Sequence, residues 1–102
     1  MEGVLHASIA EEAVIASILL NPELIEVVHP QLNPNDFICN AHKYIYQAFL
    51  ELNREGLACD ITNTAQKLEW QGVLGRNIGR HHLEQIFEKC ISAYAIEDYI
   101  KQ

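Results

Sequence analysis

An amphipathic helix with a signal at each end constrains this chain most. Between Asn40 and Gly56, apolar residues recur every three or four positions, which places them on one helix face. Asn40 is typical of a helix N-cap, and Gly56 is typical of the left-handed residue that ends a helix. The predicted inner face consists of Ala41, Tyr44, Ile45, Ala48, Phe49 and Leu52. The predicted outer faces carry His42, Lys43, Gln47, Glu51 and Arg54. This segment indicates a protein of small helices with their apolar sides packed inward.

The rest of the chain repeats this pattern, and no segment shows the period-two alternation of a strand. Asp60 is suited to cap a helix that Gly72 closes. The predicted helices cover residues 8–20, 22–28, 41–55, 61–71 and 80–91, with a further one from Ser92 to the end. A chain of 102 residues is enough for one domain. The expected fold is therefore all-α, a compact orthogonal bundle of about five to six short helices.

Local signals refine these helices. Ser8 followed by Glu11 is a capping box, which predicts that the first helix begins at Ser8. Its expected inner stripe is Ile9, Ala13, Ala16 and Leu20. The helix over residues 22–28 is apolar on all sides, so it is expected to be largely buried. Residues 33–36 indicate a turn or a single helical turn, and Phe37 and Ile38 are expected to plug into the core.

The charge and the cysteine content limit the partners. A net charge of −7, from seven basic and fourteen acidic residues, argues against direct binding of nucleic acid or of an anionic membrane. No apolar run approaches the roughly 20 residues that span a bilayer, and the start lacks a secretory signal. The odd count of three cysteines gives no disulfide framework, so we expect a reducing cytoplasm.

The sequence gives little support for a metal site or for a cysteine nucleophile. Cys39 and His42 straddle a predicted helix boundary, and His81 and His82 are adjacent, so about 100° separates them on a helix. The chain has no Cys-x-x-Cys, no His-Glu-x-x-His and no phosphate-binding loop, so we expect no metal site. Two alternatives stay open: a small helical enzyme that uses Cys39 or Cys90 with a histidine, and a freestanding helical adaptor.

The order of short motifs is more specific. Residues 12–15, then 17–20 and Asn21-Pro22, resemble the first helix of the N-terminal domain of DnaB-type replicative DNA helicases. Asp36-Phe37 followed by residues 42–46 resembles the family's Asp-Phe-Tyr and His-Arg-x-Ile-Phe.

The resemblance continues to the end of the chain. Residues 52–56, and then 60–65 with Leu68, are similar to the family's Leu-x-x-x-Gly and Asp-x-x-Thr-Leu-Ala. Residues 92–96 with Tyr99 resemble Ser-Ala-Ala-Asn-Ile-x-x-Tyr, where the family's linker helical hairpin begins. Residues 75–91 depart from the family pattern.

The resemblance implies a division of labour. Residues 1–91 would be a helical collar domain, and residues 92–102 the truncated start of the linker hairpin. In the family, six collar domains assemble above a ring of motor domains that bind ATP and DNA. The collar also docks primase and, in some organisms, a helicase loader. This fragment would then be non-catalytic and need no cofactor, while ATP and magnesium would act in the motor of an ATP-dependent 5′ to 3′ helicase.

Two sets of residues are candidates for contact with other proteins. Tyr94, Ile96, Tyr99 and Ile100 form an apolar stripe on the last predicted helix, which has nothing left to cover. We expect this stripe to support self-association, as a dimer of the fragment and a hexamer of the full-length protein. The alternative is that it folds back on its own domain. Tyr46 lies off the inner stripe and is a candidate interface anchor, or is partly buried against an adjoining loop.

Overall fold

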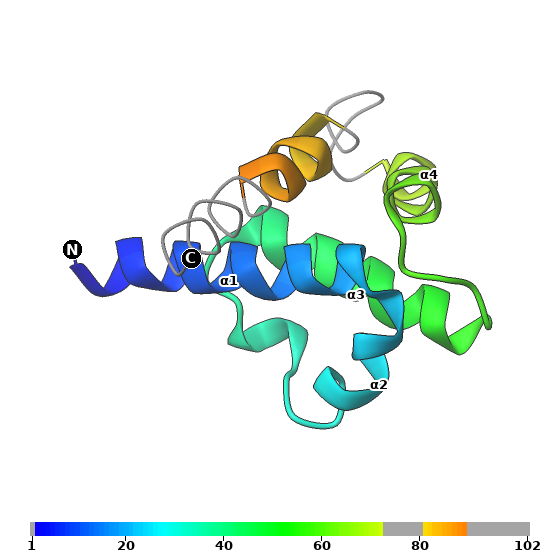
Figure 1. The fold of residues 1–102 in the computed structure, drawn as a ribbon, viewed down its shortest axis with the longest axis horizontal. Helices are drawn as coiled ribbons and strands as arrows, with labels where there is room; N and C mark the ends of the chain where they lie inside the picture. Colours follow the sequence, from blue (N-terminus) through cyan, green and yellow to red (C-terminus); the bar gives the residue numbers. More distant parts are fainter. Residues whose placement is uncertain (1, 73–80, 90–102) are drawn as a thin grey trace, which may run out of the picture.

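The computed structural model describes residues 2–72 and 81–89, with side chains from residue 9 onward (Figure 1). The labelled elements are α1 (Glu2–Leu20), η1 (Pro22–Leu24), α2 (Ile25–Val28), η2 (Pro34–Asp36), α3 (Asn40–Arg54) and α4 (Ile61–Gln71). A further helix covers residues 81–89. Within these ranges every regular element is helical, which confirms the predicted all-α fold. None of the described helices is long and apolar enough to cross a bilayer.

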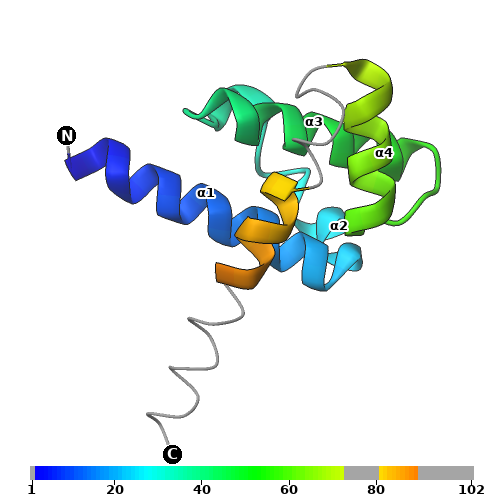
Figure 2. The ribbon, with the colours of Figure 1, turned by 90° about the horizontal axis from the view of Figure 1, so that it is seen from above.

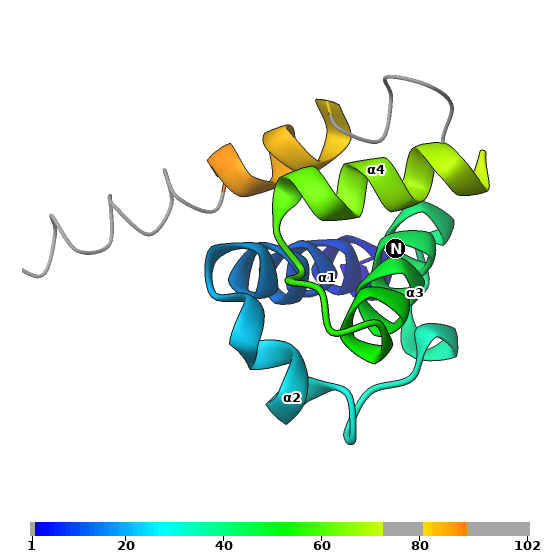
Figure 3. The ribbon, with the colours of Figure 1, turned by 90° about the vertical axis from the view of Figure 1, so that its right-hand side faces the viewer.

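The helices form layers around one core. Figure 3 shows α1 and α3 in the middle, α4 and helix 81–89 across one side of them, and α2 on the other. Seen from above, helix 81–89 crosses α1 (Figure 2), and α3 packs against both α1 and α4. The largest fully buried apolar side chains come from four of these helices: Ile15, Ile18, Ile45, Tyr46, Phe49, Leu68, Leu83 and Ile86. This arrangement places the start of α3 beside α1.

The first helix begins earlier than expected. It starts at Glu2 and passes through Ser8, so the predicted capping box does not mark its start. Good helix formers such as Leu5 and Ala7 extend it, and one serine does not stop a helix.

The buried face of α1 also differs from the predicted stripe. Its buried residues are Glu11, Ile15, Ala16, Ile18 and Leu19, whereas Ile9, Ala13 and Leu20 are exposed. Ala16 is buried as predicted. The rest of the stripe was wrong because apolar residues occupy every side of this helix, so periodicity alone could not choose the face.

The inner face of α3 is rotated from the prediction. Ile45, Ala48, Phe49 and Leu52 are buried as expected. However, Tyr44 is 36% exposed, and His42, predicted on an outer face, is 2% exposed. The N-cap is Cys39 rather than Asn40, and its side chain makes no cap hydrogen bond. Gly56 has φ +77°, which confirms the predicted helix stop.

The connecting segment is less buried than predicted. Residues 22–28 form η1 followed by one turn of α2, and of these only Ile25 is buried while Val27 is exposed. So short an element lies against the core along one side only. The predicted helical turn at residues 33–36 is confirmed as η2. Phe37 is buried as predicted, but Ile38 is 62% exposed because successive side chains in extended backbone point in opposite directions.

The signals around α4 are confirmed. Oδ1 of Asp60 accepts a hydrogen bond from the amide of Asn63 at 2.7 Å, and Gly72 ends the helix with φ +64°. The predicted helix over residues 80–91 agrees with the described helix 81–89. Cys90, Ile91 and the segment from Ser92 onward lie outside the described residues.

The Asp60 cap gives a direct test of this local reading. Replacing Asp60 with alanine leaves the Asn63 amide without its side-chain partner, so we expect the free energy of unfolding to fall by about 1 kcal/mol. Urea denaturation followed by circular dichroism measures the change. Asp60→Asn is the matched control, because asparagine caps nearly as well. Equal losses in the two variants would contradict the assigned role.

Candidate functional site

A buried carboxylate joins α1 to the start of α3. Oε2 of Glu11 accepts the backbone amide of Ile38 at 2.6 Å, and Oε1 accepts that of Cys39 at 3.3 Å. Nδ1 of His42 lies 2.8 Å from the same Oε1. Because an ionised carboxylate only accepts hydrogen bonds, Nδ1 carries the hydrogen. Glu11 therefore holds the two residues that lead into α3, although it stands about thirty positions earlier in the chain.

The environment of Glu11 favours its charged form. Burial acts to raise its pKa and is the largest single influence. The hydrogen bonds from Ile38, His42 and Cys39, together with the charge on His42, outweigh burial and lower the pKa below 4.5. The group is therefore ionised at neutral pH, and its partners compensate for its burial.

A second histidine extends this cluster to helix 81–89. The ring of His82 stacks on that of His42, with centroids 6.0 Å apart and planes inclined by 19°. Nζ of Lys89 lies 3.5 Å from Oε2 of Glu12 on α1. The Glu11 cluster, defined as Glu11, His42 and His82, thus connects three helices.

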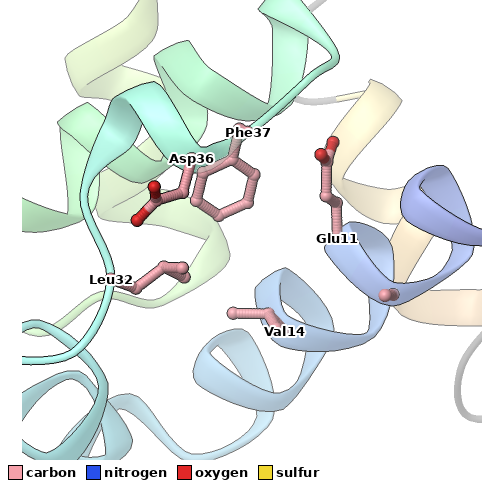
Figure 4. Close-up of a pocket in the computed structure, with 6 residues that line it drawn as sticks. Glu11, Val14, Leu32, Asp36 and Phe37 are labelled. Carbon is pink, nitrogen blue, oxygen red and sulfur yellow. The ribbon is translucent and has the colours of Figure 1, made fainter. Parts of the chain in front are cut away.

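A small hollow opens beside this cluster, between α1 and η2 (Figure 4). Its volume is about 150 Å³, enough for one modest side chain, and its walls are largely apolar. Figure 4 shows the ring of Phe37 between Asp36 and Glu11, and the same ring contacts Tyr46 with centroids 5.0 Å apart. The lining residues are Ala10, Glu11, Val14, Leu32, Asp36 and Phe37.

Large apolar side chains are exposed at separate places on the surface. Trp70 near the end of α4 is 76% exposed, Leu20 at the end of α1 is 66% exposed, and Ile38 precedes α3. The full set is Ile9, Leu20, Val27, Ile38, Tyr44, Leu57 and Trp70. Such residues are common anchors for protein partners, although single exposed apolar residues also occur on monomeric proteins.

The structure corrects one predicted contact residue. Tyr46 is fully buried, and its hydroxyl donates a hydrogen bond to the carbonyl of Leu32 at 2.8 Å. Burial, helped by the charge of Asp36, raises its pKa. The prediction of a surface anchor at Tyr46 was wrong because this polar tip is satisfied inside the domain, whereas the alternative of burial against an adjoining loop agrees with the bond to Leu32. Tyr94, Ile96, Tyr99 and Ile100 lie outside the described residues, so their role stays a prediction.

The thiols differ in their surroundings. Burial, with a smaller influence from Asp60 and Glu26, raises the pKa of the Cys59 thiol to about 11, so it stays protonated at neutral pH. His42, the nearest candidate base in sequence to Cys39, turns Nδ1 to Glu11. Cys90 lies outside the described residues.

The described part of the chain contains no group of three or more side chains suited to a metal ion.

Comparison with known proteins identifies the family. The model of the DnaB-like helicase N-terminal domain matches residues 4–102. This chain belongs to that family. The resemblance inferred from the ordered motifs is therefore confirmed.

Relatives and solved structures agree with this membership. The chain is 36% identical over 88 residues to the replicative DNA helicase DnaB of a Nostoc species, covering 86% of this chain. It is 32% identical over 92 residues to the replicative DNA helicase DnaC of Bacillus subtilis, covering 90% of this chain. The crystal structure of the N-terminal domain of DnaB helicase from Mycobacterium tuberculosis matches with a TM-score of 0.73 and 32% identity. That match covers 78% of this chain and 56% of the other.

The chain is much shorter than these helicases. It spans 10% of the Nostoc protein and 20% of the Bacillus protein. Family membership therefore describes one domain, and the activities of the whole helicases are not carried over by it.

The Glu11 cluster could not be found from local signals. Glu11 was assigned to a capping box with Ser8, whereas its partners lie 27 to 31 positions away. Glu11 precedes Ile15 and Ile18 by four and seven residues and so shares their face, but the sequence did not show that this face is the buried one. An acidic residue on a buried face requires partners.

Removing the charge of Glu11 should destabilise the domain. Glu11→Gln weakens acceptance from two amides and from His42, so we expect the free energy of unfolding at pH 7 to fall by about 2 kcal/mol. Urea denaturation measures this change. Glu23→Gln, at an exposed position of η1, is the control and should change stability by less than about 0.5 kcal/mol.

The same variant tests the pH dependence. Because folding lowers the pKa of Glu11, its contribution to stability is complete above the ordinary value of 4.5. The contribution is lost as the pH falls from there through the lower pKa of the folded state. We expect the acid-induced loss of stability to be smaller in Glu11→Gln than in the parent. Parallel acid curves for the two proteins would contradict the assignment.

Proposed function

We propose that this chain is the N-terminal interaction domain of a replicative DNA helicase and acts by binding other proteins. The observation that carries the proposal is the family match over residues 4–102, with relatives that are replicative helicases. The helicase that contains it would unwind duplex DNA with ATP and magnesium bound in a motor domain outside these residues. The setting would be DNA replication in the cytoplasm.

The proposed role is to help six helicase subunits assemble and to dock primase and, in some organisms, a helicase loader. The net charge of −7 supports protein partners over nucleic acid, because phosphate groups would be repelled. Exposed apolar side chains such as Trp70 and Ile38 support the same reading. The proposal includes no catalytic residue, cofactor or metal within this domain.

Self-association is proposed to use the stripe of Tyr94, Ile96, Tyr99 and Ile100. We expect the double variant Tyr99→Ala with Ile100→Ala to weaken dimerisation of the 102-residue chain at least tenfold, as loss of an interface anchor does (about 1.4 kcal/mol). Truncation after Ile91 should weaken it further. Sedimentation equilibrium measures the association constant.

A control variant and a stability measurement distinguish loss of the interface from loss of folding. Val27→Ala alters an exposed apolar residue on α2 and should leave the association constant unchanged. Thermal unfolding of the double variant separates the alternatives, because a stripe that folds back on its own domain would lower stability without altering association. That second pattern would overturn the proposed interface.

Primase docking needs a direct binding experiment. We expect the 102-residue chain to bind the primase of the organism that encodes it, with an affinity that isothermal titration calorimetry can measure. Trp70→Ser and Ile38→Ser remove exposed anchors without disturbing the core, and at least one of them should weaken binding roughly tenfold. A parent chain that binds no primase would contradict the docking role while leaving the assembly role open to its own test.

A further inference from the structure

Helix 81–89 is attached to the other helices by an unusual combination of contacts. Leu83 and Ile86 are fully buried and hold it by apolar packing. His82 adds the stacked contact with His42 on α3, and Lys89 adds the ion pair with Glu12 on α1. Only two of these contacts depend on charge, and of those side chains only histidine has an ordinary pKa near neutrality.

The surroundings of His82 leave no good place for a second proton. Its Nε2 is buried and has no hydrogen-bond partner among the described residues. The charged and titratable groups that face it are His42 from α3, Glu12 from α1, and Lys89 and His81 from its own helix. Beyond His42 lies Glu11, whose Oε1 is 2.8 Å from Nδ1 of that histidine. A proton on His82 would therefore be desolvated beside a ring that can itself be charged.

We propose that His82 and His42 form a pH-sensitive latch, in which protonation of His82 releases helix 81–89 from α1 and α3. The Glu11–His42 contact joins α1 to α3 and involves no atom of helix 81–89, so it stays formed in the released state. Release is therefore local to helix 81–89, while Glu11 keeps its contacts at the start of α3.

The direction of the effect follows from the environment of His82. Burial lowers the pKa of His82 most, and the charge on His42 lowers it further. Glu12 raises this pKa, whereas Lys89 and His81 lower it slightly. The docked helix thus binds a proton less readily than the released one. Docking is fully favoured above the ordinary pKa of 6.5 and weakens as the pH falls below it toward the lower pKa of the docked state.

The consequence concerns the segment that follows. Residue 89 lies three positions before Ser92, where the linker hairpin of the family begins. If the proposed function holds, the latch determines whether the hairpin starts from a docked or a released helix. Release of helix 81–89 does not depend on the proposed function, and it can be measured on the 102-residue chain alone.

Hydrogen exchange read by mass spectrometry tests the latch. We expect amide protection across residues 81–89 to fall several-fold between about pH 7.5 and about pH 5.5, up to about tenfold per pH unit for one linked proton. Rates are corrected for the intrinsic effect of pH on exchange. Protection of residues 45–52 in α3 should stay unchanged. His82→Phe keeps a stacking ring that cannot be charged, so its helix should stay protected at both pH values.

Control variants separate the latch from general acid sensitivity. His29→Gln changes an exposed histidine that is not among the groups facing His82, and should keep the full pH response of the parent. His82→Gln provides a second uncharged side chain, for the case that phenylalanine disturbs the packing, and should also lose the response. Equal loss of protection in α3 and helix 81–89, or a full pH response in both His82 variants, would overturn the proposal. A chain that fails to dimerise or to bind primase would still give these hydrogen-exchange results, so the latch and the proposed function are tested separately.

Discussion

The arrangement of α1 and α3 depends on the hydrogen bonds that the Glu11 carboxylate accepts. A helix begins with amides that have no partner inside the helix, and Cys39 at the N-cap supplies no side-chain acceptor. A carboxylate from α1 accepts the amides of Ile38 and Cys39, which lead into the helix, and also takes the hydrogen of His42. Since a buried carboxylate is tolerated only when its partners are in place, the contact fixes the two helices relative to each other.

The remaining elements build on this pair. With α1 and α3 fixed, Ile15 and Ile18 meet Ile45 and Phe49 in a single core. The α4 helix is bounded by its own cap residues, Asp60 and Gly72, and covers the core from one side. Lys67 on α4 forms an ion pair with Glu55 at 2.8 Å. Helix 81–89 adds Leu83 and Ile86 to the core but meets the polar cluster through His82, so we expect its attachment to respond to pH nearer neutrality than the Glu11 contact does.

The sequence was sufficient wherever the cause of a structure lies within a few residues. Asp60, Gly72 and Gly56 act on neighbouring backbone, and each was placed correctly. It was insufficient where the cause lies across the fold. The buried positions of His42 and Tyr46 depend on Glu11 and on the Leu32 carbonyl, partners that periodicity in α3 cannot indicate. The predicted face of α1 failed for a different reason, because a helix that is apolar all round gives no preferred side.

The motifs that carried the family resemblance consist largely of structural residues. Phe37, Ile45 and Tyr46 are buried, and Leu68 lies at the centre of the core. A match on such residues identifies a fold, since these side chains are constrained by packing rather than by partners. Of the three most exposed large apolar side chains among the described residues, Trp70 and Ile38 lie outside the quoted motifs, whereas Leu20 lies within one. The family can therefore be read largely from the core, whereas Trp70 and Ile38, two of the proposed docking residues, are not part of the motifs.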